Sequence, residues 1–267
     1  MKKLLCLSLV LFSFSCFAQQ VSICSWNLKD FGKSKSEAEI LFVAKTIASF
    51  DIIAIQEVVA TYGGSHAITR LADQLNRMGS KWDYTISNVT SGSSYKSERY
   101  AFIWKVSIVK KMGDAWLEQK FNSQIDREPF FCRFKIKDKV FTIVNFHAIT
   151  KLKQPETEIK YFKFLPSIYP NDNLIFCGDF NLPQSHTVFI PLRKMGYISA
   201  FAGQKTSLKM ECVNEVCLSS EFDNFFFNKM KLQMKRSGVI EFYKSFRDLK
   251  SARLVSDHIP IYIEAAF

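Results

Sequence analysis

Side chains that can bind a metal ion or move a proton stand beside the ends of several apolar runs in this sequence. Asp257 and His258 precede the apolar run at residues 259–263, and an acid beside an imidazole can serve both tasks. Similar polar groups close four other runs, at Trp26-Asn27, Gln56-Glu57, Asn145-Phe146-His147 and Gly178-Asp179-Phe180-Asn181. Because buried strands that repeatedly end in such residues point to one edge of a sheet, we predict a single shared site.

Each of these residues also has a structural interpretation that the sequence leaves open. Glu57 could be a solvated strand end, Asn27 a turn residue, and His147 a core histidine with satisfied hydrogen bonds. Asp179 could form an Asx turn after a buried strand. If the backbone stays extended, however, Asp179 and Asn181 project in the same direction and could together hold a cation or a phosphate oxygen.

The elements that must position these residues are mostly short strands. Apolar or alternating runs predict strands at residues 21–26, 52–56, 84–87, 100–105, 130–136, 140–147, 174–177, 221–227, 239–243 and 259–263. Helical patterns cover residues 36–50, opened by a capping box at Ser36 and Glu39, and residues 65–78, 157–169 and 186–195. Since strands outnumber helices and often follow one another directly, we expect two packed sheets with outer helices.

The first 18 residues resemble a cleavable export signal, with a basic start, an apolar stretch and a small-x-small site ending at Ala18. The apolar stretch is too short for a comfortable membrane anchor. Lipoprotein anchoring at Cys16 is disfavoured because Ser13 is a poor residue three places earlier. Residues 19–267 suit one large α/β or β-rich domain of a secreted or periplasmic protein.

The chain carries a net charge of +11, with a pI near 9.3. This balance favours a polyanionic partner such as nucleic acid or an anionic surface, although basic charge can also serve solubility alone. Cys212 and Cys217 flank a short polar loop and are the expected disulfide of an exported protein, whereas Cys24, Cys132 and Cys177 fall in strand-like runs and should be buried thiols.

Eight short motifs occur in an order that resembles the endonuclease/exonuclease/phosphatase superfamily, and within it the deoxyribonuclease I branch. They are Trp26-Asn27, Gln56-Glu57, the segment at 94–100, Arg127-Glu128-Pro129, Asn145-Phe146-His147, Gly178-Asp179-Phe180-Asn181, Phe222-Asp223-Asn224 and Ser256-Asp257-His258. The resemblance covers nearly all of the chain after residue 18. It implies a four-layer α/β sandwich, in which two mixed sheets lie face to face with helices outside, and metal-dependent hydrolysis of phosphodiesters.

The resemblance also implies a role for each matching residue. Glu57 would be the central ligand of Mg²⁺, with Ca²⁺ or Mn²⁺ as alternatives, because carboxylate and amide oxygens suit hard cations. The residues that would help to hold metal and phosphate are Asn27, Asp179, Asn181 and Asp257. His147 oriented by Glu98 and His258 oriented by Asp223 would flank the scissile phosphate, one as base and one as acid, with the assignment left open.

By the same resemblance, Arg127 would grip a DNA phosphate and Tyr95 would pack against a sugar or base in the minor groove. Such contacts give affinity with little sequence preference and a strong dependence on salt. The sequence departs from the branch at Val59, where a basic residue is expected, at the extra Ser97, and at Asn224. These departures bear on double-strand preference more than on hydrolysis.

The predicted function is therefore that of a secreted, metal-dependent endonuclease acting mainly on DNA, with RNA as an alternative, and working as a monomer without a membrane partner. Two other functions stay open from the sequence: a superfamily phosphodiesterase or phosphatase acting on a phospholipid or sugar phosphate, and a non-catalytic binding protein. Phe225-Phe226-Phe227 are better explained as core residues than as a membrane-binding hairpin. The presence of both histidines and their acids disfavours the binding protein.

Overall fold

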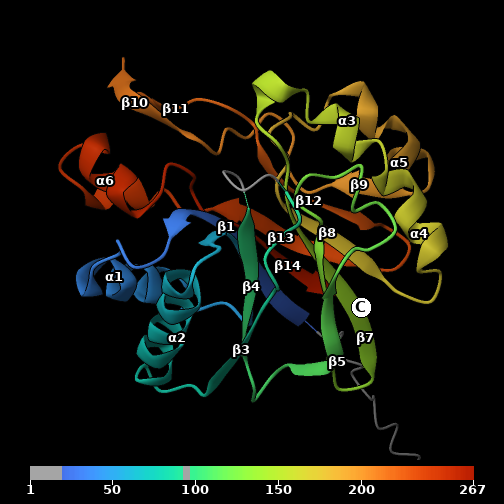
Figure 1. The fold of residues 1–267 in the computed structure, drawn as a ribbon, viewed down its shortest axis with the longest axis horizontal. Helices are drawn as coiled ribbons and strands as arrows, with labels where there is room; N and C mark the ends of the chain where they lie inside the picture. The colour runs from blue at the N-terminus through green and yellow to red at the C-terminus, as the bar shows by residue number, and fades with distance from the viewer. Residues whose placement is uncertain (1–19, 93–96) are drawn as a thin grey trace, which may run out of the picture.

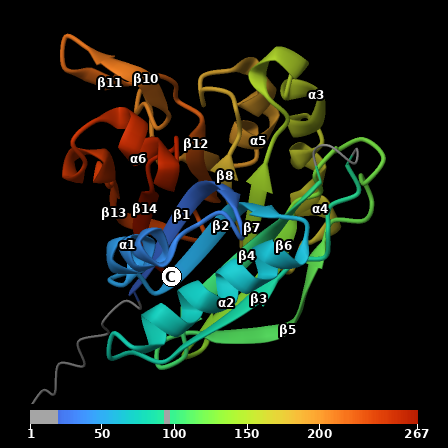
Figure 2. The ribbon, with the colours of Figure 1, turned by 60° about the vertical axis from the view of Figure 1, so that its left-hand side comes forward.

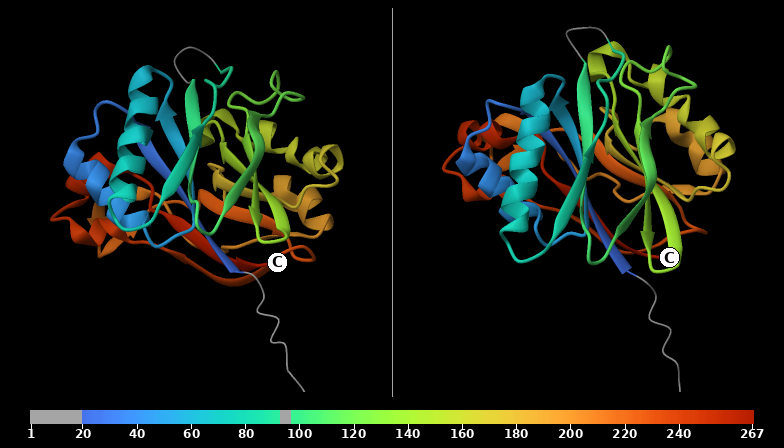
Figure 3. Two further views of the ribbon diagram at one scale, coloured as in Figure 1. Left: turned by 90° about the horizontal axis from the view of Figure 1, so that it is seen from below. Right: turned by 60° about the horizontal axis from the view of Figure 1, so that its bottom comes forward.

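The computed structural model describes residues 20–92 and 97–267. Two six-stranded sheets lie face to face, and helices cover their outer faces (Figure 1, Figure 3). The expected four-layer sandwich is thereby confirmed. The proposed export signal at residues 1–18 lies outside the described residues. Within the described part of the chain, no helix combines the length and apolar character needed to cross a membrane.

The first sheet is built largely from the N-terminal half, with two strands from the C-terminus. Its order is β13 (Gln233–Val239), β14 (Ile261–Ala266), β1 (Gln20–Phe31), β2 (Ile52–Val59), β4 (Glu98–Lys105) and β3 (Trp82–Ile86). Only the β1–β2 pair is parallel among these neighbours. The helices whose apolar residues cover this sheet are α1 (Glu37–Ile47), α2 (Tyr62–Asn76) and α6 (Leu249–Val255).

The second sheet contains the middle of the chain. Its order is β5 (Lys110–Leu117), β6 (Phe130–Ile136), β7 (Lys139–His147), β8 (Leu174–Asp179), β12 (Asp223–Asn228) and β9 (Tyr197–Ser199). Here only β7 and β8 are parallel. The chain continues after β7 into η1 (Lys151–Lys153), which is exposed. Short helical segments cover the outer face of the sheet, namely α3 (Glu156–Ile159), η2 (Phe162–Phe164), α4 (Leu165–Ile168), η3 (Thr187–Phe189) and α5 (Ile190–Lys194).

The central strands are largely apolar before their polar ends because both of their faces are buried. In β2, Ile52 and Ala54 face the second sheet, whereas Ile53 and Ile55 face the helices, as the two-residue period of a strand requires. Phe102 of β4 stacks on Phe130 of β6 across the sheet interface. Burying one large apolar side chain stabilises the fold by roughly 1.5–3 kcal/mol, so this core holds the strand ends firmly in place.

Most predicted elements form near their expected positions, and Ser36 and Glu39 make the predicted capping box of α1. The strand predicted at 239–243 is wrong. β13 ends at Val239, and η4 (Phe242–Ser245) follows. The ladder stops there because Pro260, opposite Ile240, has no N–H to donate. Phe242 instead packs against Trp26.

A hairpin that the sequence did not predict extends from the body of the protein. It comprises β10 (Leu208–Val213) and β11 (Val216–Leu218), and Figure 2 shows it above α6. Asn214 and Glu215 form its two-residue turn with φ angles of 50° and 65°, which match a type I′ hairpin turn. The expected disulfide between Cys212 and Cys217 is present and closes the hairpin near its tip, and Cys24, Cys132 and Cys177 are buried free thiols.

Candidate active site

Strands from both sheets bring the chemically interesting residues to one edge of the sandwich. The parallel pair β1–β2 places Asn27 beside Gln56 and hence close to Glu57. In the second sheet, His147 pairs with Asp179 across β7 and β8, and Asp179 pairs with Asp223 across β8 and β12. Asp179 therefore stands between the residues of two neighbouring strands. The carboxyl ends of parallel strands open at the same edge, which explains the clustering.

These residues surround one cavity of about 420 Å³. The predicted site residues that line it are Glu57, Glu98, Arg127, His147, Asp179, Asn181, Asp257 and His258. Asn27 lies directly beneath, because its amide nitrogen donates to Glu57 Oε1 at 2.9 Å and to Asp179 Oδ2 at 3.3 Å. The structure thus brings together residues that are separated by more than half of the chain.

His147 and Glu98 form the first of two buried imidazole–carboxylate pairs. The Nδ1 atom of His147 lies 3.0 Å from both carboxylate oxygens of Glu98. Its Nε2 atom faces the cavity, 3.5 Å from Asp179 Oδ2 and 3.8 Å from Glu57 Oε1. The carboxylate therefore fixes the orientation of the ring and leaves Nε2 directed at the place where a substrate would enter.

His258 and Asp223 form the second pair. The Nδ1 atom of His258 lies 2.7 Å from Asp223 Oδ2, and the Thr206 hydroxyl donates to the same oxygen at 2.6 Å. The Nε2 atom of His258 lies 3.6 Å from Asp179 Oδ2. The backbone is held as well, since the indole N–H of Trp26 donates to the His258 carbonyl at 2.7 Å. Both imidazoles therefore direct Nε2 at one oxygen of Asp179.

The surroundings drive the proton affinities of the two imidazoles in opposite directions. Burial, reinforced by the Arg127 charge, lowers the pKa of His147 to about 4. Burial alone would also lower the pKa of His258, but Asp223 and Asp179 outweigh it and raise that pKa to about 10. At neutral pH these opposite shifts favour an uncharged ring at His147 and a charged ring at His258.

Two carboxylates beside these rings, Glu98 and Asp179, are perturbed in the same direction. Burial raises the pKa of Glu98 to about 7, although the nearby Arg127 opposes the shift. Burial also raises the pKa of Asp179, opposed chiefly by the charge of His258. Carboxylates held in this way gain from a nearby positive charge, because it offsets the cost of keeping them ionised away from water.

Several residues beside the cavity have a backbone conformation that non-glycine residues rarely adopt. The φ angles of Glu57 and Asn181 are 58° and 51°, and those of Lys29 and Asp30 are 44° and 47°. Such strain costs on the order of 1–3 kcal/mol per residue and is found where function requires a particular side-chain direction. The extended backbone that the sequence suggested for Asp179 to Asn181 is thus replaced by a turn, in which Asp179 Oδ1 accepts the Asn181 N–H at 2.9 Å.

The donor atoms around the cavity fit a hard divalent cation. Glu57 and Asp179 supply carboxylate oxygens to the cavity. Asp223 and His258 have donor atoms within 4.8 Å of Asp179, but these two side chains are paired with each other. Asn27 lies between the carboxylates of Glu57 and Asp179. Mg²⁺ and Ca²⁺ prefer such oxygen ligands, whereas zinc prefers histidine and cysteine in closed tetrahedral sites.

Asp257 and Arg127 also line the cavity, but both are engaged by basic or backbone groups beside it. Asp257 Oδ2 lies 3.1 Å from an Arg253 nitrogen and 3.8 Å from Lys29 Nζ. Arg127 is only 7% exposed, and its guanidinium donates to the backbone carbonyls of His147, at 3.0 Å, and of Ala148.

The Arg127 guanidinium also lies 3.5 Å from Glu98 Oε2. Arg127 thus contacts the backbone at His147 and Ala148 as well as the Glu98 carboxylate. Only an edge of its guanidinium reaches the cavity. Tyr95, the other predicted DNA contact, lies outside the described residues.

The departures in the sequence have different consequences. Val59 lines the cavity, so an apolar side chain takes the place of a basic one there. Asn224 is buried and exchanges two hydrogen bonds with the Phe201 backbone, which makes it a structural residue. Sequence reasoning missed Lys29 and Thr206. Lys29 could have been noticed because it follows Asn27 by two residues, but nothing local links Thr206 to Asp223.

A model of the endonuclease/exonuclease/phosphatase family matches residues 24–258, so the chain belongs to this family. A protein named deoxyribonuclease from Thioalkalivibrio sp. (strain K90mix) is 26% identical over 262 residues, which cover 90% of this chain and 70% of that protein. Human deoxyribonuclease gamma is 27% identical over 275 residues, covering 91% and 85% of the two chains. These similarities confirm the resemblance seen in the motifs and support a nuclease or phosphodiesterase activity.

Among solved structures, an endonuclease/exonuclease/phosphatase family protein from Bacteroides thetaiotaomicron superimposes with a TM-score of 0.69 at 18% identity. The match covers 94% of this chain and 98% of that one. At this identity the similarity bears on the fold alone. It agrees with the two mixed sheets and outer helices described above.

Proposed function

We propose that this protein is an exported, divalent-metal-dependent endonuclease that hydrolyses phosphodiester bonds of DNA with little sequence preference. The observation that carries the proposal is the pair of imidazoles directed at Asp179, each oriented by its own carboxylate and with opposite pKa shifts. Family membership and similarity to proteins named deoxyribonuclease support the substrate class. The net positive charge suits a polyanion.

In this proposal His147 accepts a proton from the attacking water, because its Nε2 is unprotonated at neutral pH and faces the cavity. His258 donates a proton to the leaving oxygen, because its ring is held in the charged form by Asp223 and Asp179. Glu98 and Asp223 keep the two rings in place. Asn181, whose amide donates to the Ala148 carbonyl at 3.0 Å, positions the substrate phosphate beside Asp179.

The cation would be Mg²⁺, with Ca²⁺ or Mn²⁺ as alternatives, and would be held chiefly by Glu57 and Asp179, with Asn27 beside both carboxylates and Asp257 at the rim. When bound, it would offset the negative charge that builds up on the phosphate.

Substrate contacts beyond the cavity complete the proposal. Tyr95 would contact the nucleotide beside the cleavage site, as the family resemblance implies. For Arg127 we now propose mainly a supporting role, because its guanidinium is occupied by His147, Ala148 and Glu98. The segment at residues 1–18 would direct export, and the domain at 19–267 would act as a monomer.

The decisive experiment is plasmid nicking by the pure protein across Mg²⁺, Ca²⁺ and Mn²⁺, with linear DNA and RNA in parallel. We expect nicked and then linear plasmid, with activity abolished by EDTA. His66→Ala is the matched control for the two catalytic histidines, because His66 is exposed and stacks only on Tyr62. Intact plasmid together with hydrolysis of a phospholipid or sugar phosphate would support the alternative superfamily function. Binding without hydrolysis of any substrate would support the non-catalytic protein.

A further inference from the structure

A second cavity of about 690 Å³ lies beside the active site, between the β10–β11 hairpin and α6. Figure 1 and Figure 2 show these two elements next to each other at one side of the molecule. Lys29 lines both this cavity and the active-site cavity, so the two are neighbours that share a wall. A chain leaving the active site on this side would enter the second cavity, which we call the hairpin groove.

The walls of the hairpin groove are fixed by specific contacts. Arg253 of α6 donates to the Leu208 carbonyl of β10 at 2.8 Å and pairs with Asp257 at 3.1 Å. The buried Lys35 ammonium donates to the Leu254 and Val255 carbonyls, both at 2.8 Å, and so anchors the end of α6. Together with the disulfide that closes the hairpin, these contacts fix both walls of the groove.

Most of the charged residues that line the hairpin groove are basic, and some of these side chains are exposed and not held by distant carboxylates. Four of its lining residues are basic, Lys29, Arg247, Lys250 and Arg253, and two are acidic, Glu211 and Asp248. The Arg247 side chain is 93% exposed, and its only ion pair among the described residues is with its neighbour Asp248. Lys250 is exposed, and no described carboxylate lies within 4.0 Å of its ammonium.

The remaining lining is apolar. Met210 of β10 is 74% exposed and Leu254 of α6 is 65% exposed, although both face a groove rather than a packed core. Apolar side chains between cations suit a flexible polyanion whose phosphates meet the charges while its sugars and bases cover the apolar surface. Such a surface offers few hydrogen bonds to base edges, so it would bind without reading sequence.

We propose that the hairpin groove binds the phosphodiester backbone of the DNA strand that continues beyond the cleavage site, chiefly through Arg247 and Lys250. This inference rests on the proposed function, which it deepens by adding a subsite for the flanking strand. It assigns the β10–β11 hairpin, which the sequence did not predict, a role in substrate affinity. It also accounts for free positive charge beside a cavity that is itself lined with carboxylates.

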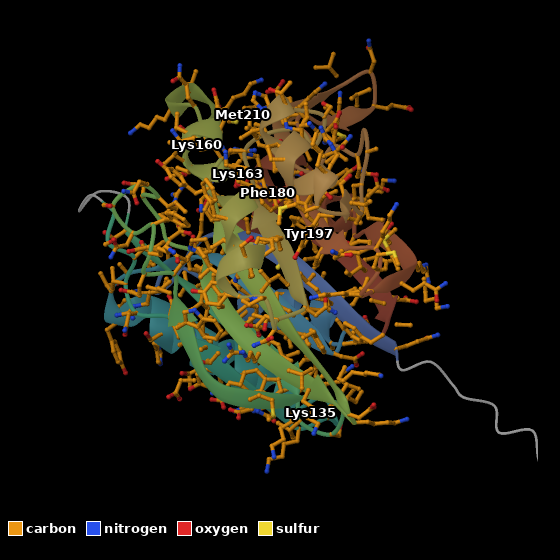
Figure 4. All side chains as sticks on the ribbon, turned by 90° about the vertical axis from the view of Figure 1, so that its right-hand side faces the viewer. Lys135, Lys160, Lys163, Phe180, Tyr197 and Met210 are labelled. Atoms are coloured by element: carbon orange, nitrogen blue, oxygen red, sulfur yellow. A yellow bond between two sulfur atoms is a disulfide. The ribbon has the colours of Figure 1, made fainter. Side chains whose placement is uncertain are left out.

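The test compares two double variants that remove the same charge. Arg247→Gln/Lys250→Gln neutralises the groove. Lys110→Gln/Lys135→Gln is the control, because these two lysines pair across β5 and β6 and Lys135 lies at the opposite end of the molecule from Met210 (Figure 4). Each is assayed with Mg²⁺ for KM on long DNA as a function of salt, and for kcat/KM on bis(p-nitrophenyl) phosphate. DNA binding is measured by fluorescence anisotropy in a His147→Ala background, which blocks cleavage.

We expect the groove variant to raise KM and Kd for DNA and to make log Kd less dependent on log salt, by about 1 for each cation removed. Its activity on the small diester should equal that of the wild type, and the control should behave as the wild type on both substrates. Equal salt slopes for the groove variant and the control would overturn the proposal. A protein that binds DNA through the groove but cleaves none would retain the subsite and refute the nuclease function.

Discussion

His147 and Asp179 stand opposite each other at the end of the parallel β7–β8 ladder, with His147 Nε2 3.5 Å from Asp179 Oδ2. The contact depends on the residue before Asp179. Gly178 has a φ angle of 131°, and a Cβ added there would lie 1.9 Å from the Phe146 carbonyl oxygen of the neighbouring strand. Only glycine allows the two strands to approach this closely and to end side by side.

Gly178→Ala should therefore both destabilise the protein and disturb the site. The strained φ angle costs roughly 1–3 kcal/mol, and the clash with the Phe146 carbonyl adds to it. We expect a clear fall in Tm and in activity, measured by thermal unfolding and plasmid nicking. Gly203→Ala is the control, because Gly203 also has a positive φ angle, of 73°, but no atom lies within 4 Å of a Cβ added there. Equal losses in Tm for the two variants would argue against the close approach.

His147→Ala and His258→Ala should each lower kcat by roughly 10²–10⁴-fold, the usual contribution of a positioned acid or base. Each ring is held by its own carboxylate and directs Nε2 at the cavity, and neither belongs to an apolar core cluster, so we expect the fold to survive the change. Circular dichroism checks the fold, and single-turnover cleavage checks the rate. If a variant keeps a near-normal kcat, the histidine that it lacks is not the acid or base proposed above.

The opposite pKa shifts of the two histidines can be measured directly in metal-free protein by NMR titration of the imidazole nitrogens. We expect His147 to titrate near pH 4 and His258 near pH 10. Asp223→Asn should lower the pKa of His258, because it removes the carboxylate that favours the charged ring. A His258 that titrates near its ordinary value of about 6.5 in the unmodified protein would contradict the assignment of acid and base.

Glu57→Gln should weaken binding of the divalent cation, since a neutral amide replaces a carboxylate in the proposed ligand set. The Mg²⁺ concentration for half-maximal cleavage should rise, and calorimetric titration should show weaker cation binding in the absence of substrate. Glu215→Gln at the exposed hairpin turn removes the same charge away from the cavity and should leave both titrations unchanged. Unchanged titrations for Glu57→Gln would remove it from the ligand set.

Stability in acid should depend on Asp172. Burial tends to raise its pKa, but hydrogen bonds from Arg133 and Thr142 outweigh burial and lower it below the ordinary value. Stability from this group is therefore present above the unfolded pKa of about 3.9 and is lost as the pH falls through the lower, folded pKa.

In urea unfolding between pH 2.5 and 7, we expect Asp172→Asn to reduce stability near neutral pH and to flatten its decline in acid. Asp114→Asn is the control, because Asp114 is exposed on the edge strand β5. Curves for Asp172→Asn that parallel the wild type throughout would show that the Arg133 and Thr142 contacts add no net stability.

The sequence by itself determined most of the central strands, their polar ends and the family. Largely apolar runs such as residues 52–55 and 141–144 predict strands buried on both faces, and the residues that follow them are set by the chain itself. The sequence did not reveal the edge strands β5 and β9 or the β10–β11 hairpin. The four-layer arrangement followed from these runs together with the motifs, and the family match agrees with it.

Only the tertiary structure decided how the polar ends relate to one another. That His147 and His258 share Asp179, that Arg127 is occupied by the His147 loop, and that Thr206 supports Asp223 all depend on contacts between residues far apart in the chain. The same holds for residues 239–243, where Pro260 ends the ladder. Local periodicity specifies which face of a strand is buried, whereas the pKa of a side chain depends on charges and burial that appear only when distant strands pack together.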